Sequence, residues 1–233
     1  MNRKIYFLIY PLILSTHVLV NSAKAAPHVD LGLSLGSNLS FLNLKEESNS
    51  ALDANSSLSP TFKFESQIGI DDFLGFGVNY LQSHYNFQSQ TSKYNMETGT
   101  GVISELSTEV LWFQEFFEVA LSFNAQNRPL FKIQSDDDIS SSSTSFSSFG
   151  IGGNLILGQS SVSQIKMGVQ MQNGLQMNNI DSFWALNSLF KIKIKSSETF
   201  SFFIEGNYNY ETIENGDQVQ KLNTVIMLFG LGI

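Results

Sequence analysis

The sequence has no cysteine, only three histidines, and few charged residues, which make up 15% of its 233 positions. Without cysteine, neither a disulfide framework nor a thiolate metal site can form. Beyond residue 25 there is no apolar run of the roughly 20 residues that a membrane-spanning helix needs. A mature chain that enters a membrane must therefore do so as a closed β-barrel, because an open sheet leaves backbone groups unpaired in lipid.

Residues 1–25 have the three parts of a secretory signal peptide: a basic start, an apolar run over 5–20, and small residues before Ala25. A transmembrane anchor is the alternative interpretation. Pro11 and the polar residues 15–17 interrupt the run, which leaves it short of a spanning helix. We therefore predict a cleaved signal peptide at residues 1–25.

Cleavage after residue 25 leaves 26–233 as the mature chain, with 10 basic and 21 acidic residues and a net charge of −11. Nucleic acid is bound through Lys and Arg on phosphates, so this charge argues against such a partner. The length suits one domain, since all-β barrels of about 200–250 residues commonly form one.

From Val29 onward the chain alternates with a period of two, which is typical of β-strands. In the first segment Val29, Leu31, Leu33 and Leu35 share an apolar face, and small or polar residues occupy the other. We predict ten strands, with eight and twelve as alternatives. The predicted segments are 29–41, 61–70, 74–80, 100–112, 117–124, 149–157, 164–171, 184–195, 200–210 and 223–233.

The connections alternate in length, which is typical of a transmembrane barrel. Short turns are expected near 71–72, 114–115, 159–161 and 196–198. Longer polar loops are expected near 45–58, 88–98, 128–147, 177–183 and 211–220. The pattern predicts an all-β fold: a single antiparallel up-and-down transmembrane β-barrel that follows the signal peptide.

A soluble β-sandwich or barrel would also alternate, so the chemistry of the two faces matters. The apolar face ends in aromatic residues, which suit the depth of lipid headgroups. These are Phe41, Tyr80, Trp184, Tyr208 and Tyr210 toward the loops, and Trp112, Phe117 and Phe200 toward the turns. The other face is rich in Gly, Ser, Asn and Gln, so we expect the apolar face to lie in lipid.

The last strand, 223–233, ends at the chain terminus with Val225, Met227, Phe229, Leu231 and Ile233 on one face. With this strand, the signal peptide and the turn asymmetry, the mature chain resembles the bacterial outer-membrane β-barrel proteins, which include small porins and structural barrels. The resemblance implies the outer membrane of a Gram-negative bacterium and contact with its lipid. It also implies assembly machinery that reads the last strand. That group usually ends in an aromatic residue, whereas this chain ends in Ile233.

Ten charged residues lie on the polar faces of the predicted strands, five of each sign, and we expect them to face the lumen. They are Lys63, Glu65, Glu105, Glu109, Glu118, Lys166, Lys191, Lys193, Lys195 and Glu205. Glu109 and Glu118 lie near one turn, and 191–195 precede another, so an acidic wall is expected to oppose a basic one. Buried charges are costly unless paired, which favours a salt-bridged plug over a selective constriction.

Catalysis and metal binding have little support in the sequence. Ser83 and His84 are adjacent on a strand, so their side chains point to opposite faces and cannot form a nucleophile and base pair. Pairing of His84 with the acidic run Asp136, Asp137 and Asp138 is geometrically possible. That run could also bind Ca²⁺, although its spacing is not that of an EF-hand and a solvated extracellular loop explains it better. We expect no enzyme activity and no cofactor.

Two functions remain open. The first is a small transport or structural barrel, either a narrow pore or a membrane module plugged by salt bridges, since eight strands are filled by side chains and about 16 leave a channel. The second is an adhesin or receptor whose extracellular loops bind an unknown partner, since loops on a rigid barrel often carry recognition.

Overall fold

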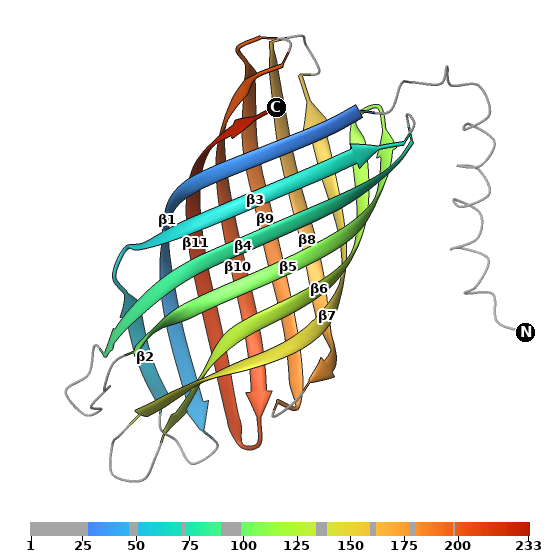
Figure 1. Cartoon of the computed structure of the whole chain (residues 1–233). Helices are drawn as coiled ribbons and strands as arrows, with labels where there is room; N and C mark the ends of the chain where they lie inside the picture. The colour runs from blue at the N-terminus through green and yellow to red at the C-terminus, as the bar shows by residue number, and fades with distance from the viewer. Residues whose placement is uncertain are drawn as a thin grey trace, which may run out of the picture.

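The computed structural model describes residues 28–46, 51–70, 73–89, 99–133, 139–158, 162–177, 180–197 and 199–233. In these ranges the chain forms eleven antiparallel β-strands in one sheet, which closes into a ring where β1 pairs with β11 (Figure 1). The strands are β1 (His28–Glu46), β2 (Ala51–Ser56), β3 (Ser59–Gly69), β4 (Leu74–Ser89), β5 (Gly99–Gln114), β6 (Phe117–Ile133), β7 (Ile139–Leu157), β8 (Ser163–Met177), β9 (Ser182–Lys195), β10 (Ser201–Asn215) and β11 (Gln218–Gly232). The predicted all-β up-and-down barrel is confirmed.

The expected number of ten strands corresponds to ten positions around the ring. β2 and β3 both pair with β1 on one side and β4 on the other, so together they occupy a single position. The break between them falls at Ser57 and Leu58. The described residues contain no helix long and apolar enough to cross a membrane.

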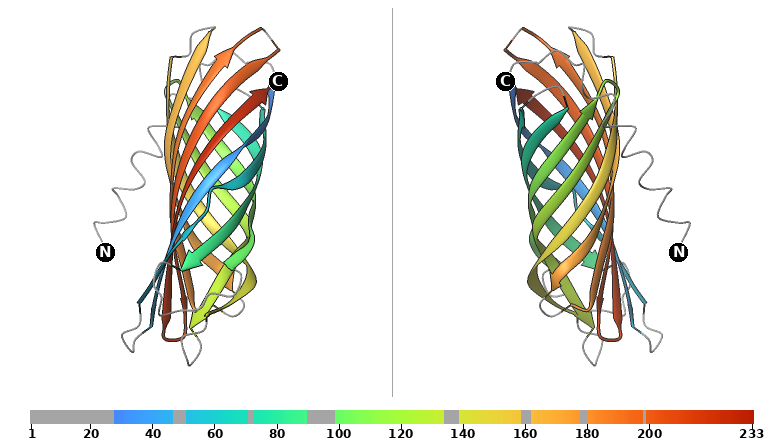
Figure 2. Two further views of the ribbon diagram at one scale, coloured as in Figure 1. Left: turned by 90° about the vertical axis from the view of Figure 1, so that its left-hand side faces the viewer. Right: turned by 90° about the vertical axis from the view of Figure 1, so that its right-hand side faces the viewer.

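The barrel has two different ends (Figures 1 and 2). β1 begins and β11 ends at the same end, which we call the turn end; β2 lies near the opposite end, which we call the loop end. Near the turn end the outer wall is apolar: Val29, Leu33 and Phe229 are 55%, 51% and 60% exposed. Ser34, the residue after Leu33 on β1, is 2% exposed and points inward. A continuous outward apolar band of this kind needs lipid around it.

The polarity of the wall inverts at Phe41. Toward the turn end from this residue, β1 is apolar outside and polar inside. Beyond it, Leu42 and Leu44 are buried inside, while the amide of Asn43 donates a hydrogen bond to Asp53 on the exterior (2.6 Å). Because polar side chains replace the apolar band outside, the loop end of the barrel lies in water and has an internal core of its own.

Two of the expected long loops are therefore largely wrong. Residues 128–147 mostly belong to β6 and β7, which pair from Ile133↔Ile139 toward the turn end. Residues 211–220 belong to β10 and β11, joined by a tight turn at Gly216, whose φ of 59° suits glycine. Part of the expected loop 45–58 is β2. Polar exteriors made these water-exposed strands look like loops.

Aromatic residues mark the outer edge of the lipid band. Trp184 and Tyr210 pack together with ring centroids 5.1 Å apart, and the Tyr208 hydroxyl donates a hydrogen bond to Asn223 (2.8 Å). This matches the aromatic belt expected toward the loops, with apolar rings facing lipid and polar tips near water.

Candidate functional site: the barrel interior

The interior of the barrel contains a chamber of about 620 Å³. At the turn end its lining includes the exposed residues Gln114 and Glu115, so the chamber opens there. Toward the loop end the lining reaches Glu105 and Asn209. In the described part of the chain, the lining includes no residue of the apolar clusters beyond this level.

Nine of the ten charged residues expected in the lumen line this chamber: Lys63, Glu65, Glu105, Glu109, Glu118, Lys166, Lys191, Lys193 and Glu205. Lys195 is the exception. It lies exposed at the end of β9, outside the described lining of the chamber. Its alternation is that of an inward residue, but the strand ends there and the side chain leaves the barrel.

Four of these charges form a cluster across β3, β9 and β10, which we call the quartet: Lys63, Glu65, Lys191 and Glu205. Lys63 lies 2.5 Å from Glu205 and 3.2 Å from Glu65, and Lys191 forms ion pairs with the same two carboxylates. The Lys191 ammonium also lies 3.8 Å from the centroid of the Phe203 ring. Each cation thus faces two anions, which compensates the cost of burying them.

The expected confrontation of acidic and basic walls is wrong. Lys191 pairs with Glu65 and Glu205 rather than with Glu109 or Glu118, and Lys193 pairs with Asp30 (3.2 Å). Glu118 has its own partner, Lys166 (2.8 Å). Lys191 of β9 thus reaches Glu65 of β3, whose strand lies four positions away around the ring, as many as the strand of Glu109.

Beyond the charged level, the interior is filled by amides and hydroxyls. The Asn38 amide donates hydrogen bonds to Thr61 Oγ1 (2.9 Å) and to the His84 carbonyl (2.9 Å). The Gln126 amide donates to Ser148 Oγ and to Gln172 Oε1 (both 2.6 Å). These bonds link strands β1, β3, β4, β6, β7 and β8 inside the wall.

Arg128 of β6 lies on the loop-end side of these amides and is 2% exposed. Its Nε donates to both oxygens of Glu211 on β10 (3.1 and 2.9 Å), and its Nη2 donates to Glu105 on β5 (2.7 Å). Its Nη1 donates to the carbonyl of Ser104 (3.0 Å). One guanidinium thus joins three strands across the interior through charge-assisted bonds.

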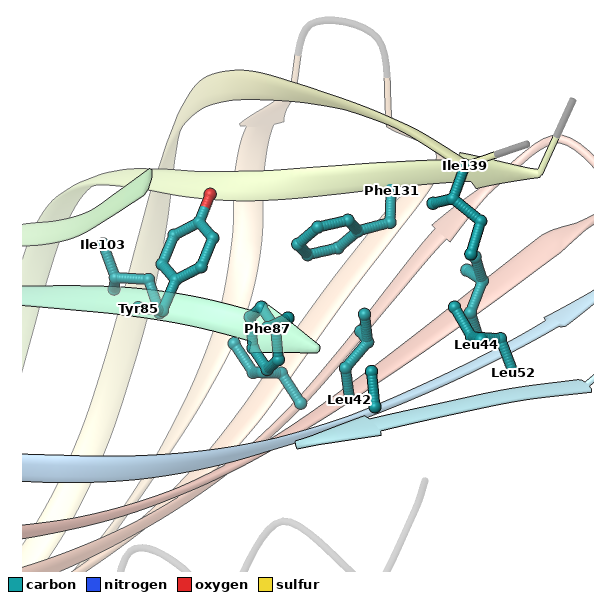
Figure 3. Packing of buried hydrophobic residues seen from close by; sticks show 10 residues of the cluster. Leu42, Leu44, Leu52, Tyr85, Phe87, Ile103, Phe131 and Ile139 are labelled. Atoms are coloured by element: carbon teal, nitrogen blue, oxygen red, sulfur yellow. The ribbon is translucent and has the colours of Figure 1, made fainter. Parts of the chain in front are cut away.

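Two apolar clusters close the loop end beyond Arg128. The larger one contains Leu42, Leu44, Leu52, Ala54, Tyr85, Phe87, Ile103, Phe131, Ile139 and Leu222 (Figure 3). The rings of Phe87 and Phe131 meet edge to face with centroids 5.4 Å apart. The smaller cluster contains Phe146, Ile180, Phe183, Ala185 and Ile213. Both resemble the core of a water-soluble domain rather than the lining of an open pore.

Sequence reasoning missed Asp30, Arg128 and Glu211, although the alternation contained a signal for each. Glu211 continues the inward series of Glu205, Asn207 and Asn209, and Arg128 continues the even-numbered inward series of β6. Both fell in segments interpreted as loops. Leu42 and Leu44 carried the sign of the inversion, since they change face relative to the outward leucines before them.

The remaining candidate residues form no catalytic arrangement in the described residues. Ser83 is buried inside and hydrogen bonded to Thr61 (3.1 Å), while His84 is exposed on the exterior, with Nε2 3.5 Å from Gln82 Nε2. Asp136, Asp137 and Asp138 lie outside the described residues, as does the predicted signal peptide. Within the described ranges no three potential metal ligands gather together.

Comparison with solved structures finds several that are similar to this chain. The outer membrane protease OmpT from Escherichia coli is similar over 91% of this chain and 98% of its own, with a TM-score of 0.54 and 11% identity. The translocator domain of the autotransporter NalP from Neisseria meningitidis covers 98% of this chain and 95% of its own (TM-score 0.42, 9% identity). Ail of Yersinia pestis, an attachment invasion locus protein, covers 88% and 98% (TM-score 0.32, 11% identity).

The chain has the fold of the bacterial outer-membrane β-barrels. The resemblance expected from the sequence is confirmed at the level of the fold. No protein-family model and no curated protein matches the sequence. At 11% identity the likeness to OmpT concerns the fold and carries over no activity.

Proposed function

We propose that this outer-membrane barrel is a narrow pore that ion pairs and a packed loop end keep closed at rest. Its turn end faces the periplasm, and assembly machinery inserts it through β11. The observation that carries the proposal is the buried Arg128, which joins Glu105 and Glu211 across the interior. The polar chamber between Arg128 and the turn end supplies the water-accessible part of the path.

The size of the barrel supports this function. Eight-stranded barrels are filled by side chains and those with about 16 strands hold a channel, and the ten positions here lie near the filled end. A purely structural barrel needs only a filled interior, yet this one keeps a chamber of about 620 Å³ lined by charges and amides. A maintained polar cavity favours a solute path. No described arrangement supports an enzyme.

Planar-bilayer recording of the refolded mature chain tests the proposal. We expect a closed baseline with brief, small openings, because the ion pairs and the apolar clusters block the interior. A large, steady conductance at low voltage would mean that the interior is open in the membrane. Complete silence at every voltage, with no uptake of small solutes into vesicles, would leave a structural module.

Surface recognition is the second candidate, supported by the part of the barrel that extends past the lipid band with a polar exterior at Asn43 and Asp53. Replacing Asp136, Asp137 and Asp138 with Asn tests it, since this change avoids the core residues Ile139 and Phe146. Adhesion of expressing cells to collagen- and fibronectin-coated wells is the measurement. Lost adhesion with unchanged conductance supports recognition, and unchanged adhesion contradicts it.

A further inference from the structure

The β6–β7 hairpin separates from the rest of the wall at the loop end. β5 and β6 pair only as far as Ser104↔Asn127 among the described residues, although β6 continues to Ile133 and stays paired with β7. Pro129 lies two residues beyond Asn127, and a proline has no N–H to donate to a neighbouring strand. The ladder between β5 and β6 therefore stops there, and β6 is free to leave the wall.

The other strand of the hairpin has an irregularity at the same level. The pairing of β7 with β8 begins at Phe146↔Met177 among the described residues, and its register shifts between Ser147 and Ser148. Such a bulge bends a strand and weakens its ladder locally. Residues 129–133 and 139–146, which we call the lid hairpin, are thus joined to the barrel at two points suited to bending.

Polar bonds seat the lid hairpin across the mouth of the barrel. Gln220 of β11 accepts a hydrogen bond from the Phe131 N–H (3.1 Å) and donates one to the Pro129 carbonyl (2.8 Å). A strand edge that leaves its neighbour is thus satisfied by a side chain from a distant strand. At the base, Arg128 donates to the Ser104 carbonyl, the last residue of β5 that pairs with β6.

Apolar packing completes the seat. Figure 3 shows Ile139 of the lid hairpin pointing toward Leu44 and Leu52, while the Phe131 ring lies against Tyr85 and Phe87 of β4. Ser141 and Ser143, on the face of β7 opposite to Phe146, are exposed, and so is Ser142 between them. The hairpin is therefore amphipathic: Phe131 and Ile139 belong to the larger apolar cluster, and Phe146 belongs to the smaller one, against which Leu130 packs.

We infer that the lid hairpin swings outward about Pro129 and Ser147 and opens the chamber to the external medium. The inference rests on the proposed pore and names its outer entrance, its gate and its class of solute. In the closed state the hairpin covers the mouth through Gln220 and the cluster around Phe131. Opening it uncovers the interior down to Arg128, and the path reaches Asn209 in the chamber when the ion pairs of Arg128 with Glu105 and Glu211 also separate.

The lining of the chamber selects the solute. Lys63, Lys166, Lys191 and Lys193 each pair with a carboxylate, but the described lining holds seven acidic side chains in all, so the chamber has an excess of negative charge. Amides such as Asn209 line the same space and can donate and accept hydrogen bonds. A volume of about 620 Å³ suits a small molecule. Small polar solutes that are neutral or positively charged fit this lining, and anions do not.

Cysteine accessibility tests the lid, since the chain has no cysteine of its own. Asn209→Cys places a thiol in the chamber, and a small charged methanethiosulfonate reagent added to intact cells reports access from outside. We expect slow labelling in this parent and labelling about tenfold faster with Gln220→Ala, because two hydrogen bonds that hold the lid are lost. Labelling after permeabilisation should be fast in both, which shows that the thiol is reactive.

Thr224→Ala is the matched control. Thr224 lies on the same strand and is buried, but its hydroxyl bonds to Ser40 of β1 rather than to the lid hairpin (3.0 Å). It should label like the parent, and electrophoretic mobility without heating checks that each variant is folded. Equal labelling of the Gln220 and Thr224 variants overturns the lid, as does a parent labelled equally fast from outside and after permeabilisation. Faster labelling without any rise in bilayer conductance supports the lid and overturns the proposed pore.

Discussion

The Gly36→Ala variant should fail to close the barrel. Gly36 pairs with Leu228 at the seam between β1 and β11, where the ring is completed. A methyl group at this position would overlap the Met227 carbonyl oxygen and lie 2.9 Å from the Leu228 Cα. These are backbone atoms of the closing strand, so the clash can be relieved only by separating the strands. We expect almost no folded protein after refolding into detergent, measured by electrophoretic mobility without heating.

Gly206→Ala is the control for that variant. Gly206 lies on β10 and pairs with the same Met227, but the nearest atom to an added methyl group is the flexible Met227 sulfur at 3.7 Å. This substitution should fold like the parent, since 3.7 Å is ordinary van der Waals contact. Equal yields of both variants would show that the seam tolerates a wider spacing than the ladder from Gly32 to Glu46 indicates.

The lipid-facing part of the fold could be predicted because lipid imposes one simple rule on every strand. Outward residues such as Leu33 and Phe229 must be apolar, so a period of two shows both the strand and its outer face. The rule ends at Phe41. Beyond it, water covers the exterior, and the serine-rich stretch after Ile139 is polar on most positions, so composition alone predicts a loop there.

The partners of the charged residues could not be predicted for a different reason. Alternation shows that Lys191 points inward, but not which of several inward carboxylates it reaches. That choice depends on the tilt of the strands and on the distances between strands on different sides of the barrel. In the structure these bring Lys191 of β9 to Glu65 of β3 and leave Glu109 hydrogen bonded to Ser107 (3.4 Å). A register error of two residues would have changed the partners without changing the face.

Replacement of Arg128 by Met should lower the free energy of unfolding by about 3–5 kcal/mol, the usual result of removing one partner from a buried ion pair. Methionine keeps much of the side-chain volume, so little of the loss comes from an empty space. The loss comes from Glu211, 5% exposed, which loses both hydrogen bonds from Nε, and from Glu105, which keeps only the bond from Gln172 among the described contacts (3.0 Å). Urea unfolding in lipid vesicles, followed by tryptophan fluorescence, measures it.

Two further variants separate charge from packing. Adding Glu211→Gln to Arg128→Met should restore part of the lost stability, because a neutral amide is less costly to bury than a carboxylate without a partner. Lys166→Met removes the partner of Glu118 in the chamber, where the lysine is 21% exposed, and should cost less than Arg128→Met. If the Arg128 and Lys166 variants lose the same stability, and Glu211→Gln restores none, then water reaches the Arg128 level, and the loop end of the barrel is not closed.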